Sequence, residues 1–311
     1  MLFSRFERFV FFIIFIILIL DLLLIYLKDI RVDWVGYGLI IAFSIAILAL
    51  GLFYRACRRE ERIAETLVLA ACFIFFTIVG SVLNYMFLPI HFPRIDEHLA
   101  LVDDLFGYRW PDFVQSITQW PYFSYLLKLI YSSTLVQFAF IILLLGFTAN
   151  SRKLSQFVLT GIIGALISIF IWVFFPTFGP SAIWSIEDEV LKRADLIVGP
   201  AYGGELIKLS LEGVDYLSPA NLLGLIGFPS YHTIMAAMSV VFTWQFYWIR
   251  MPMLCLNALM IPALLAHGGH HLCDFLGGLI VFTLAYLAAE KLIRAIGNIP
   301  DRGELAVNNK F

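Results

Sequence analysis

Charge and paired cysteines are both scarce in this sequence. Asp, Glu, Lys and Arg make up only 14% of its 311 residues, against about 25% in an average soluble domain. The net charge is −2, so the chain offers no basic surface large enough for a nucleic acid. Its four cysteines form no Cys-x-x-Cys pair and lie in or beside apolar runs, which is typical of small buried side chains.

Hydrophobic residues are abundant instead. They make up 61% of the chain, aromatic residues make up 16%, and the mean hydropathy is +0.89. A soluble fold of this length could not bury so many Phe, Leu and Ile side chains. The composition therefore excludes a soluble enzyme and a disordered chain, and it indicates an integral membrane protein.

Eight apolar runs approach the roughly 20 residues that a membrane-spanning helix needs. They cover about 9–27, 35–54, 66–90, 124–148, 156–176, 230–249, 252–267 and 271–292. We therefore expect an all-α, polytopic membrane helix bundle of about eight transmembrane helices. Its expected parts are two N-terminal helices in 1–65, a six-helix catalytic core in 66–293 and a cytoplasmic tail in 294–311.

The distribution of basic residues predicts how the bundle lies in the membrane. With the N-terminus inside, 13 of the 21 Lys and Arg residues fall on the cytoplasmic side and 8 on the other. The cluster of Arg55, Arg58 and Arg59 is the strongest single indication. Both termini are then cytoplasmic, and the two long polar connections, 91–123 and 177–229, face outward.

Four of the six histidines lie in two short segments that this topology brings to the outer face. The first is GFPSYHT, residues 227–233, at the start of the sixth predicted helix, and the second is HGGHHLCD, residues 267–274, before the eighth. Ser230 is suited to be an N-cap, and Gly268-Gly269 predicts a tight turn. Both helix starts then direct free N–H groups toward one pocket, which favours an anion such as phosphate.

The spacing within these segments indicates nucleophilic catalysis. His270 and Asp274 are four residues apart, so on a helix they share one face and can touch. A carboxylate bound to one imidazole nitrogen fixes the tautomer and leaves the other nitrogen free as a nucleophile. His232, which arrives from another helix, can then protonate the leaving group.

Two other interpretations of the histidines stay open. His267 and His271 are also four residues apart, which with His270 and Asp274 suggests a metal site. Against this, Gly268-Gly269 interrupts the helix between them, and the chain has no His-Glu-x-x-His motif. We therefore expect no metal and no other cofactor. The second interpretation is a set of satisfied polar residues between helices, although polar groups inside a membrane bundle are rare and usually functional.

These residues resemble the type 2 phosphatidic acid phosphatase superfamily, whose motifs are Lys-x6-Arg-Pro, Pro-Ser-Gly-His and Ser-Arg-x5-His-x3-Asp. Residues 229–232 match the second motif with Tyr231 in place of glycine, and His270-x3-Asp274 matches the end of the third. The resemblance implies a metal-independent reaction through a phosphohistidine. In it, His270 attacks phosphorus, His232 protonates the leaving oxygen and Asp274 orients the nucleophile.

The cationic residues of these motifs are absent. The chain has no Arg-Pro pair, and Ala263 and Leu264 stand where the third motif has Ser-Arg. The Phe-Pro-Ser-x-His and Gly-Gly-His forms are similar instead to a branch with inositol phosphorylceramide synthases and related bacterial membrane proteins. The candidates for substrate binding are residues of the two segments and outward basic residues, namely Ser230, Tyr231, Gly269, His267, His271, Lys208 and Arg109.

The sequence thus predicts an enzyme of the bacterial inner, or plasma, membrane that acts on a lipid phosphate at the outer face. It is either a phosphatase or a phosphotransferase with an alcohol acceptor, because water and an alcohol would occupy the same place. One alternative is a headgroup transferase of the inositol phosphorylceramide synthase type. Another is a non-catalytic lipid-binding or transport protein on the same scaffold.

Overall fold

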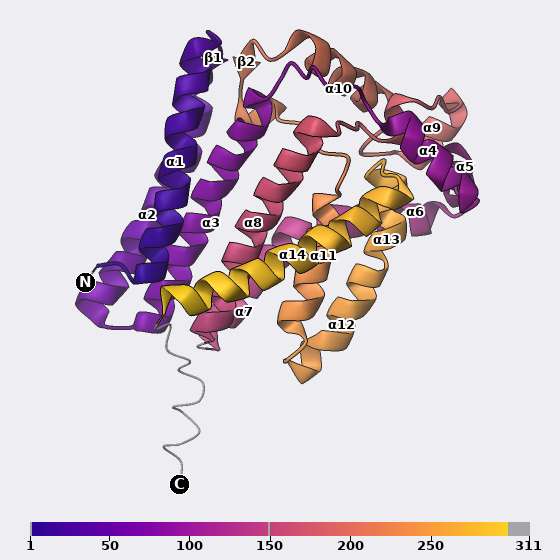
Figure 1. Ribbon diagram of the computed structural model, residues 1–311. Coiled ribbons are helices and arrows are strands. Elements are labelled where there is room, and N and C mark those ends of the chain that lie inside the picture. The colour runs from indigo at the N-terminus through magenta and orange to yellow at the C-terminus, as the bar shows by residue number, and fades with distance from the viewer. Residues whose placement is uncertain (1, 149, 298–311) are drawn as a thin grey trace.

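The computed structural model describes residues 2–148 and 150–297 of a chain that is almost entirely helical (Figure 1). The long apolar helices are α1 (Arg5–Leu27), α2 (Trp34–Phe53, continued by a π-helical turn, Tyr54–Arg58), α3 (Glu61–Met86), α8 (Ser151–Phe174) and α14 (Leu272–Ile296). The shorter helices are α4 (Asp96–Leu105), α5 (Trp110–Thr118), α6 (Pro121–Ser132), α7 (Thr134–Phe147), α9 (Asp188–Ala194), α10 (Pro200–Glu212), α11 (Tyr231–Thr243), α12 (Tyr247–Ala258) and α13 (Met260–His267). Two strands, β1 (Arg31–Val32) and β2 (Tyr216–Leu217), pair in parallel.

Six helical stretches in the described part of the chain are long and apolar enough to cross a membrane. They are α1, α2 with its π-helical end, α3, α8, the combined α12 and α13, and α14. The bent pair α6 and α7 makes a seventh if it is counted as one span. The long apolar helices indicate an integral membrane protein with six or seven candidate spans by length and composition, so the predicted count of eight is not confirmed.

Two of the predicted spans are not single long helices in the structure, and the reasons are local. Helices α6 and α7 meet at an angle of 49°, and the hydroxyl of Ser133 between them donates to the carbonyl of Ile130 at 2.7 Å. Such bonding to the helix's own backbone weakens its hydrogen-bond ladder and bends it. Helix α11 ends at Thr243, and its 13 residues span only about 20 Å of a hydrocarbon core of about 30 Å.

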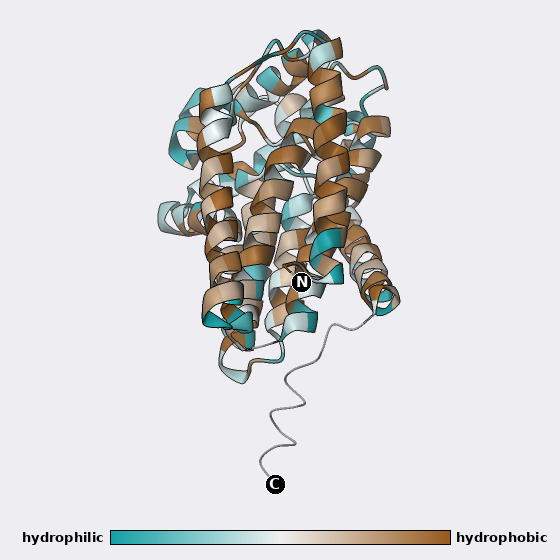
Figure 2. Ribbon diagram, turned by 90° about the vertical axis from the view of Figure 1, so that its left-hand side faces the viewer, coloured by the Kyte–Doolittle hydropathy of each residue, from teal (hydrophilic) through white to brown (hydrophobic). Residues whose placement is uncertain are grey.

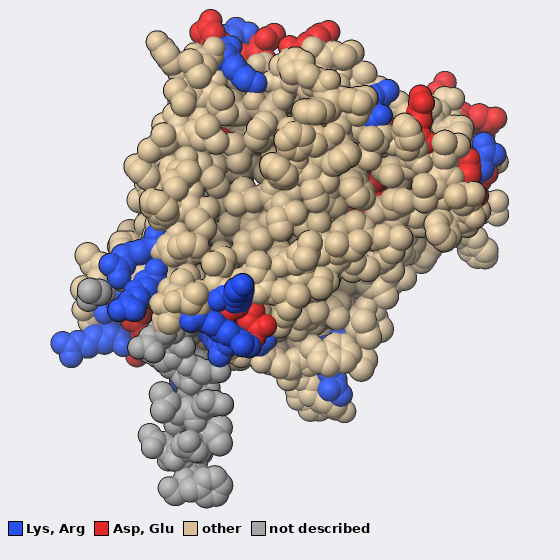
Figure 3. All heavy atoms as spheres, in the orientation of Figure 1, with Lys and Arg blue, Asp and Glu red and all other residues tan. Residues whose placement is uncertain are grey.

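The surface separates into charged ends and an uncharged belt. Figure 3 shows Lys, Arg, Asp and Glu gathered at the two ends of the molecule, with a broad tan zone between them. Figure 2 shows that the helices crossing this zone are largely hydrophobic. The start of α1 and the end of α14 lie at the same end (Figure 1). From residue 298 onward, the predicted cytoplasmic tail lies outside the described residues.

The bundle is held together by a buried aromatic core. Phe138 of α7 and Phe157 of α8 pack with ring centroids 4.7 Å apart, and Phe157 packs on Phe242 of α11 at 5.3 Å. Helix α3 packs against α1, α2, α7 and α8, and α14 crosses α8 and α11. These contacts fix the direction of α11 and α14, whose starts carry the two histidine segments.

A layer of short helices and loops covers the other end of the bundle. It contains α4, α5, α9 and α10, together with the β1–β2 pair (Figure 1). The turn between α1 and α2 is tied into this layer because the hydroxyl of Ser218 donates to Asp33 at 2.8 Å. In addition, the ammonium of Lys28 donates to the carbonyls of Met86 and Leu88 at 2.6 and 2.7 Å.

Candidate active site

The starts of α11 and α14 touch directly. Ser230 is the N-cap of α11, where its hydroxyl accepts the N–H of Thr233. Its own N–H donates to the carbonyl of Asp274 at 3.0 Å. The helices approach this closely because Gly278 has no side chain, and a Cβ there would lie 2.6 Å from the Ser230 carbonyl oxygen. The two histidine segments are therefore held in one place.

His270 and Asp274 form a buried pair. The Nδ1 atom of His270 lies 2.9 Å from Oδ2 of Asp274, which also accepts the backbone N–H of His271 at 2.9 Å. Asp274 is fully buried and His270 is 5% exposed. An ionised carboxylate accepts the Nδ1 proton, so Nε2 keeps its lone pair. That nitrogen lies 3.4 Å from the hydroxyl of Ser230.

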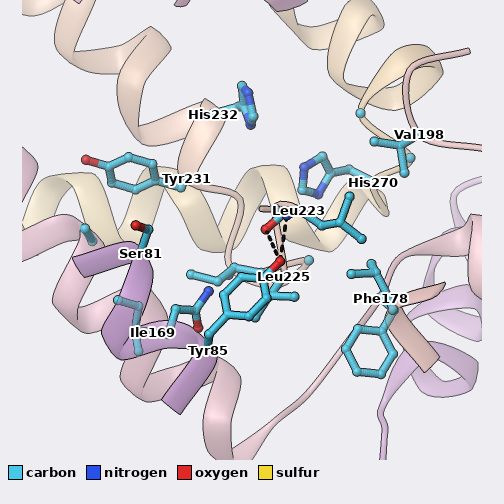
Figure 4. Close-up of a pocket in the computed structure, with 18 of the residues that line it drawn as sticks. Ser81, Tyr85, Ile169, Phe178, Val198, Leu223, Leu225, Tyr231, His232 and His270 are labelled. Carbon is cyan, nitrogen blue, oxygen red and sulfur yellow. Dashed lines mark hydrogen bonds between the residues drawn. The ribbon is translucent and has the colours of Figure 1, made fainter. Parts of the chain in front are cut away.

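His232 faces His270 across the same cavity (Figure 4). The two ring centroids are 6.5 Å apart. Tyr131 stacks on the ring of His232 at a centroid distance of 4.3 Å, which fixes the ring plane. Both imidazoles therefore border the space that a substrate would occupy.

The cavity has a volume of about 300 Å³ and is mostly apolar. Besides His232 and His270, the predicted residues that line it are Tyr231 and Gly269. The hydroxyl of Tyr231 donates to the carbonyl of Gly161 in α8 at 3.0 Å. Within the part of the chain that the structure describes, no Lys, Arg, Asp or Glu lines the cavity.

The structure places the other predicted binding residues away from this cavity. Arg109 is exposed, lies near Asp104 and Asp112 at 3.7 and 3.8 Å, and packs over the ring of Trp184. Lys208 is exposed on α10.

His267 lines a second, smaller cavity of about 170 Å³ together with Lys128 and Arg193. Its Nε2 atom lies 2.9 Å from the Ser124 carbonyl oxygen.

His271 belongs to a separate buried pair with Asp103 of α4. Its Nδ1 lies 2.7 Å from Oδ2 of Asp103, and Oδ1 accepts the N–H of Leu272 at 3.0 Å. Burial favours the neutral ring, but the hydrogen bond that the ring donates to Asp103 and the charges of Asp274, Asp103 and Asp96 outweigh it and raise the pKa of His271. No local pattern in the sequence marks Asp103, because its contact with α14 joins helices that are distant along the chain.

Asp96 fixes the connection that follows α8. Its Oδ1 accepts the backbone N–H groups of Phe178 and Gly179 at 2.8 and 2.9 Å. Burial raises the pKa of Asp96, and the hydrogen bond from Phe178 acts in the opposite direction. Phe178 lines the cavity, so Asp96 positions one of its walls.

We looked next for side chains that are grouped as metal ligands. Among residues 2–148 and 150–297, no group of three or more His, Cys, Asp or Glu side chains is placed so that it could hold a metal ion. His267 turns toward Ser124, and His271 toward Asp103.

One of three comparisons with known proteins identifies a family. A family model described as the PAP2 superfamily matches residues 97–288. This segment runs from α4 into α14 and contains His232, His270 and Asp274. Helices α1, α2 and α3 precede it. No curated protein and no solved structure matches the chain.

Proposed function

The chain belongs to the PAP2 superfamily, and we propose that it is an integral membrane enzyme that hydrolyses or transfers a lipid phosphoester. Phosphatases and phosphotransferases make up this superfamily, and the apolar helices provide access to lipid substrates. The observation that carries the proposal is the pairing of His270 with Asp274 at 2.9 Å, opposite His232 in one cavity.

The geometry supports a reaction in two steps. In the first, the lone pair of His270 Nε2 forms a bond to phosphorus, the bond from phosphorus to the lipid oxygen breaks, and His232 gives that oxygen a proton. In the second, water or an alcohol attacks the phosphohistidine and gives its proton to His232, and the P–N bond breaks. Asp274 stabilises the imidazole and holds its tautomer throughout.

The turn before His270 supports phosphate binding without lysine or arginine. Gly268 has right-handed dihedral angles, with φ −86° and ψ −13°, and Gly269 has a φ of +57°. Successive N–H groups in such a conformation form a concave nest for anions. Among the hydrogen bonds of the described residues, none engages the N–H groups of Gly269 and His270. These groups, with the Ser230 hydroxyl, are our candidates for holding the phosphate oxygens.

We place the reaction at the outer face of the membrane. The starts of α11 and α14 lie beneath the layer of short helices (Figure 1). The C-terminal end of α14 lies at the other end of the molecule, on the same side as the N-terminus. With both termini in the cytoplasm, as the basic residues predict, this layer is extracytoplasmic.

The proposal is tested with purified protein and radiolabelled phosphatidic acid. We expect release of inorganic phosphate and transient label on residue 270, located by mass spectrometry. His270→Ala should lower turnover by about 10³-fold or more, because it removes the nucleophile. The exposed His98 of α4 provides a matched control, and His98→Ala should leave turnover unchanged.

Two results would contradict this assignment. Turnover that survives His270→Ala would show that His270 is not the nucleophile. Binding of phosphatidic acid without phosphate release or label would favour the non-catalytic lipid-binding alternative.

A further inference from the structure

One wall of the cavity comes from α3, which lies outside the segment that the family model matches. Thr77, Ser81 and Asn84 line the cavity from this helix. Their spacing places them on one face. Figure 4 shows Ser81 and Tyr85 of α3 on the opposite side of the cavity from His232 and His270.

The polar groups on this wall have unused hydrogen-bonding capacity. Asn84 is 8% exposed, and its Oδ1 is buried without a hydrogen-bond partner in the described part of the chain. The hydroxyls of Ser81 and Thr77 donate to the carbonyls of Ile78 and Ile74, which leaves their oxygen lone pairs free to accept. A buried amide without a partner is costly. A ligand that donates a hydrogen bond would satisfy the Oδ1 atom of Asn84.

The α3 wall of the cavity offers no charged partner to its occupant. Phe76, Ile169, Leu206 and Leu225 make up much of the remaining surface, and no described Lys, Arg, Asp or Glu contributes to it. A buried charge without a partner is strongly unfavourable. An alcohol supplies the required donor without a charge.

Thr77 also indicates how this alcohol enters. It is exposed although it lines the cavity. It lies about 14 Å along the helix axis from the outer end of α3 at Met86, at 1.5 Å per residue. At this depth a membrane-spanning α3 is surrounded by acyl chains, which favours entry of the alcohol from the lipid.

We propose that Thr77, Ser81 and Asn84, which are spread over about 10 Å of α3, bind the polar groups of an uncharged alcohol that accepts the phosphoryl group. This rests on the proposed function. The alcohol oxygen attacks the phosphorus of the phosphohistidine, the P–N bond breaks, and the alcohol proton passes to His232. A lipid alcohol of the bilayer and a water-soluble polyol share this chemistry, and the experiment separates them.

The test measures how the phosphoryl group divides between alcohol and water. Purified protein in lipid nanodiscs receives radiolabelled phosphatidic acid with either ceramide or glycerol, and the ratio of phosphorylated alcohol to inorganic phosphate is measured. Asn84→Leu should lower this ratio by up to about tenfold, the loss expected for one neutral hydrogen bond. A fall with ceramide alone identifies a lipid alcohol, and a fall with glycerol alone identifies a polyol.

A matched pair of variants distinguishes loss of the α3 site from a general effect of replacing an exposed threonine. Thr77 and Thr283 are both exposed, and both hydroxyls donate to a carbonyl of their own helix. Thr77→Val should lower the ratio, and Thr283→Val on α14 should not. A photoactivatable diacylglycerol should crosslink to α3 in the wild type and several-fold less in Asn84→Leu, because the probe loses a hydrogen bond.

The outcomes distinguish this site from the catalytic proposal. An unchanged ratio and crosslink in Asn84→Leu, or a wild type that forms only inorganic phosphate with both alcohols, would overturn the α3 site while leaving the hydrolase intact. Absence of any phosphohistidine would contradict the proposed function. The crosslink needs no turnover, so it still decides whether α3 binds an alcohol.

Discussion

At the scale of single residues, two adjacent histidines have different partners. His270 pairs with Asp274 on its own helix and lines the cavity. His271 pairs with Asp103 of another helix and is fully buried. The first arrangement exposes a nitrogen to a ligand, and the second fastens α4 to the start of α14. The pair of His271 and Asp103 is therefore expected to contribute to stability.

Asp103→Asn should destabilise the protein in a pH-dependent way. The pKa of His271 is raised above its ordinary 6.5, so the charged pair stabilises the wild type fully below pH 6.5 and loses this effect as the pH rises through the raised pKa. At pH 6 the variant should lose about 3 kcal/mol, because breaking a buried pair leaves one partner uncompensated. Thermal unfolding across pH 5–9 measures both effects.

Asp104 is the matched control for this change. It neighbours Asp103 on α4 but is exposed, and Asp104→Asn should shift the unfolding free energy by no more than about 0.5 kcal/mol. Equal losses in the two variants, or an unchanged pH profile in Asp103→Asn, would refute the stabilising pair.

At the scale of elements, the crossing of α11 and α14 sets the distance between the two imidazoles. Gly278→Ala places a Cβ 2.6 Å from both the Ser230 carbonyl oxygen and the Thr233 Cβ. The helices must separate, so we expect a loss of about 1–3 kcal/mol of stability. Turnover should fall as well, because His232 moves away from His270. Unfolding and phosphate-release assays check the two effects.

Gly38 of α2 provides the comparison. A Cβ there meets no atom within 4 Å, so Gly38→Ala should be neutral or stabilising by about 0.5–1 kcal/mol through helix propensity. If Gly278→Ala keeps full turnover, the close crossing is not required for catalysis.

The sequence predicts the long apolar helices better than it predicts the bends and the short helices. Apolar runs locate α1, α2, α3, α8 and α14 because length and hydropathy alone decide a membrane span. The bend between α6 and α7 lies at Ser133, and hydropathy does not register it. The short α11 and the helices of the outer layer depend on packing against neighbours that are distant in sequence.

The same distinction applies to the site. The contact between His270 and Asp274 follows from a spacing of four residues within one turn of structure, and the structure contains it. Asp103 and Asn84 reach the region from other helices, so no local pattern identifies them. The catalytic roles of His232, His270 and Asp274 stay predictions.

At the scale of the whole molecule, the N-terminal helices are joined to the connection that leads into the site. β1 pairs with β2, and Ser218 donates to Asp33 at 2.8 Å. Ser218→Ala should therefore loosen residues 213–229, and limited proteolysis there should accelerate by several-fold, since one hydrogen bond is lost.

Ser116 serves as the control for this prediction. Its exposed hydroxyl bonds only to the Phe113 carbonyl of its own helix, so Ser116→Ala should leave the cleavage rate unchanged. Equal cleavage of the wild type and Ser218→Ala would show that the strand pair does not restrain the connection.

The β1–β2 pair also has a consequence for the order of assembly during synthesis. Translation proceeds from the N-terminus, so Arg31–Val32 leaves the ribosome long before Tyr216–Leu217. The edge that receives the later strand is therefore already available when the connection to His232 emerges. The first two helices, which lie outside the family segment, are thus synthesised before the connection that pairs with them and leads to His232.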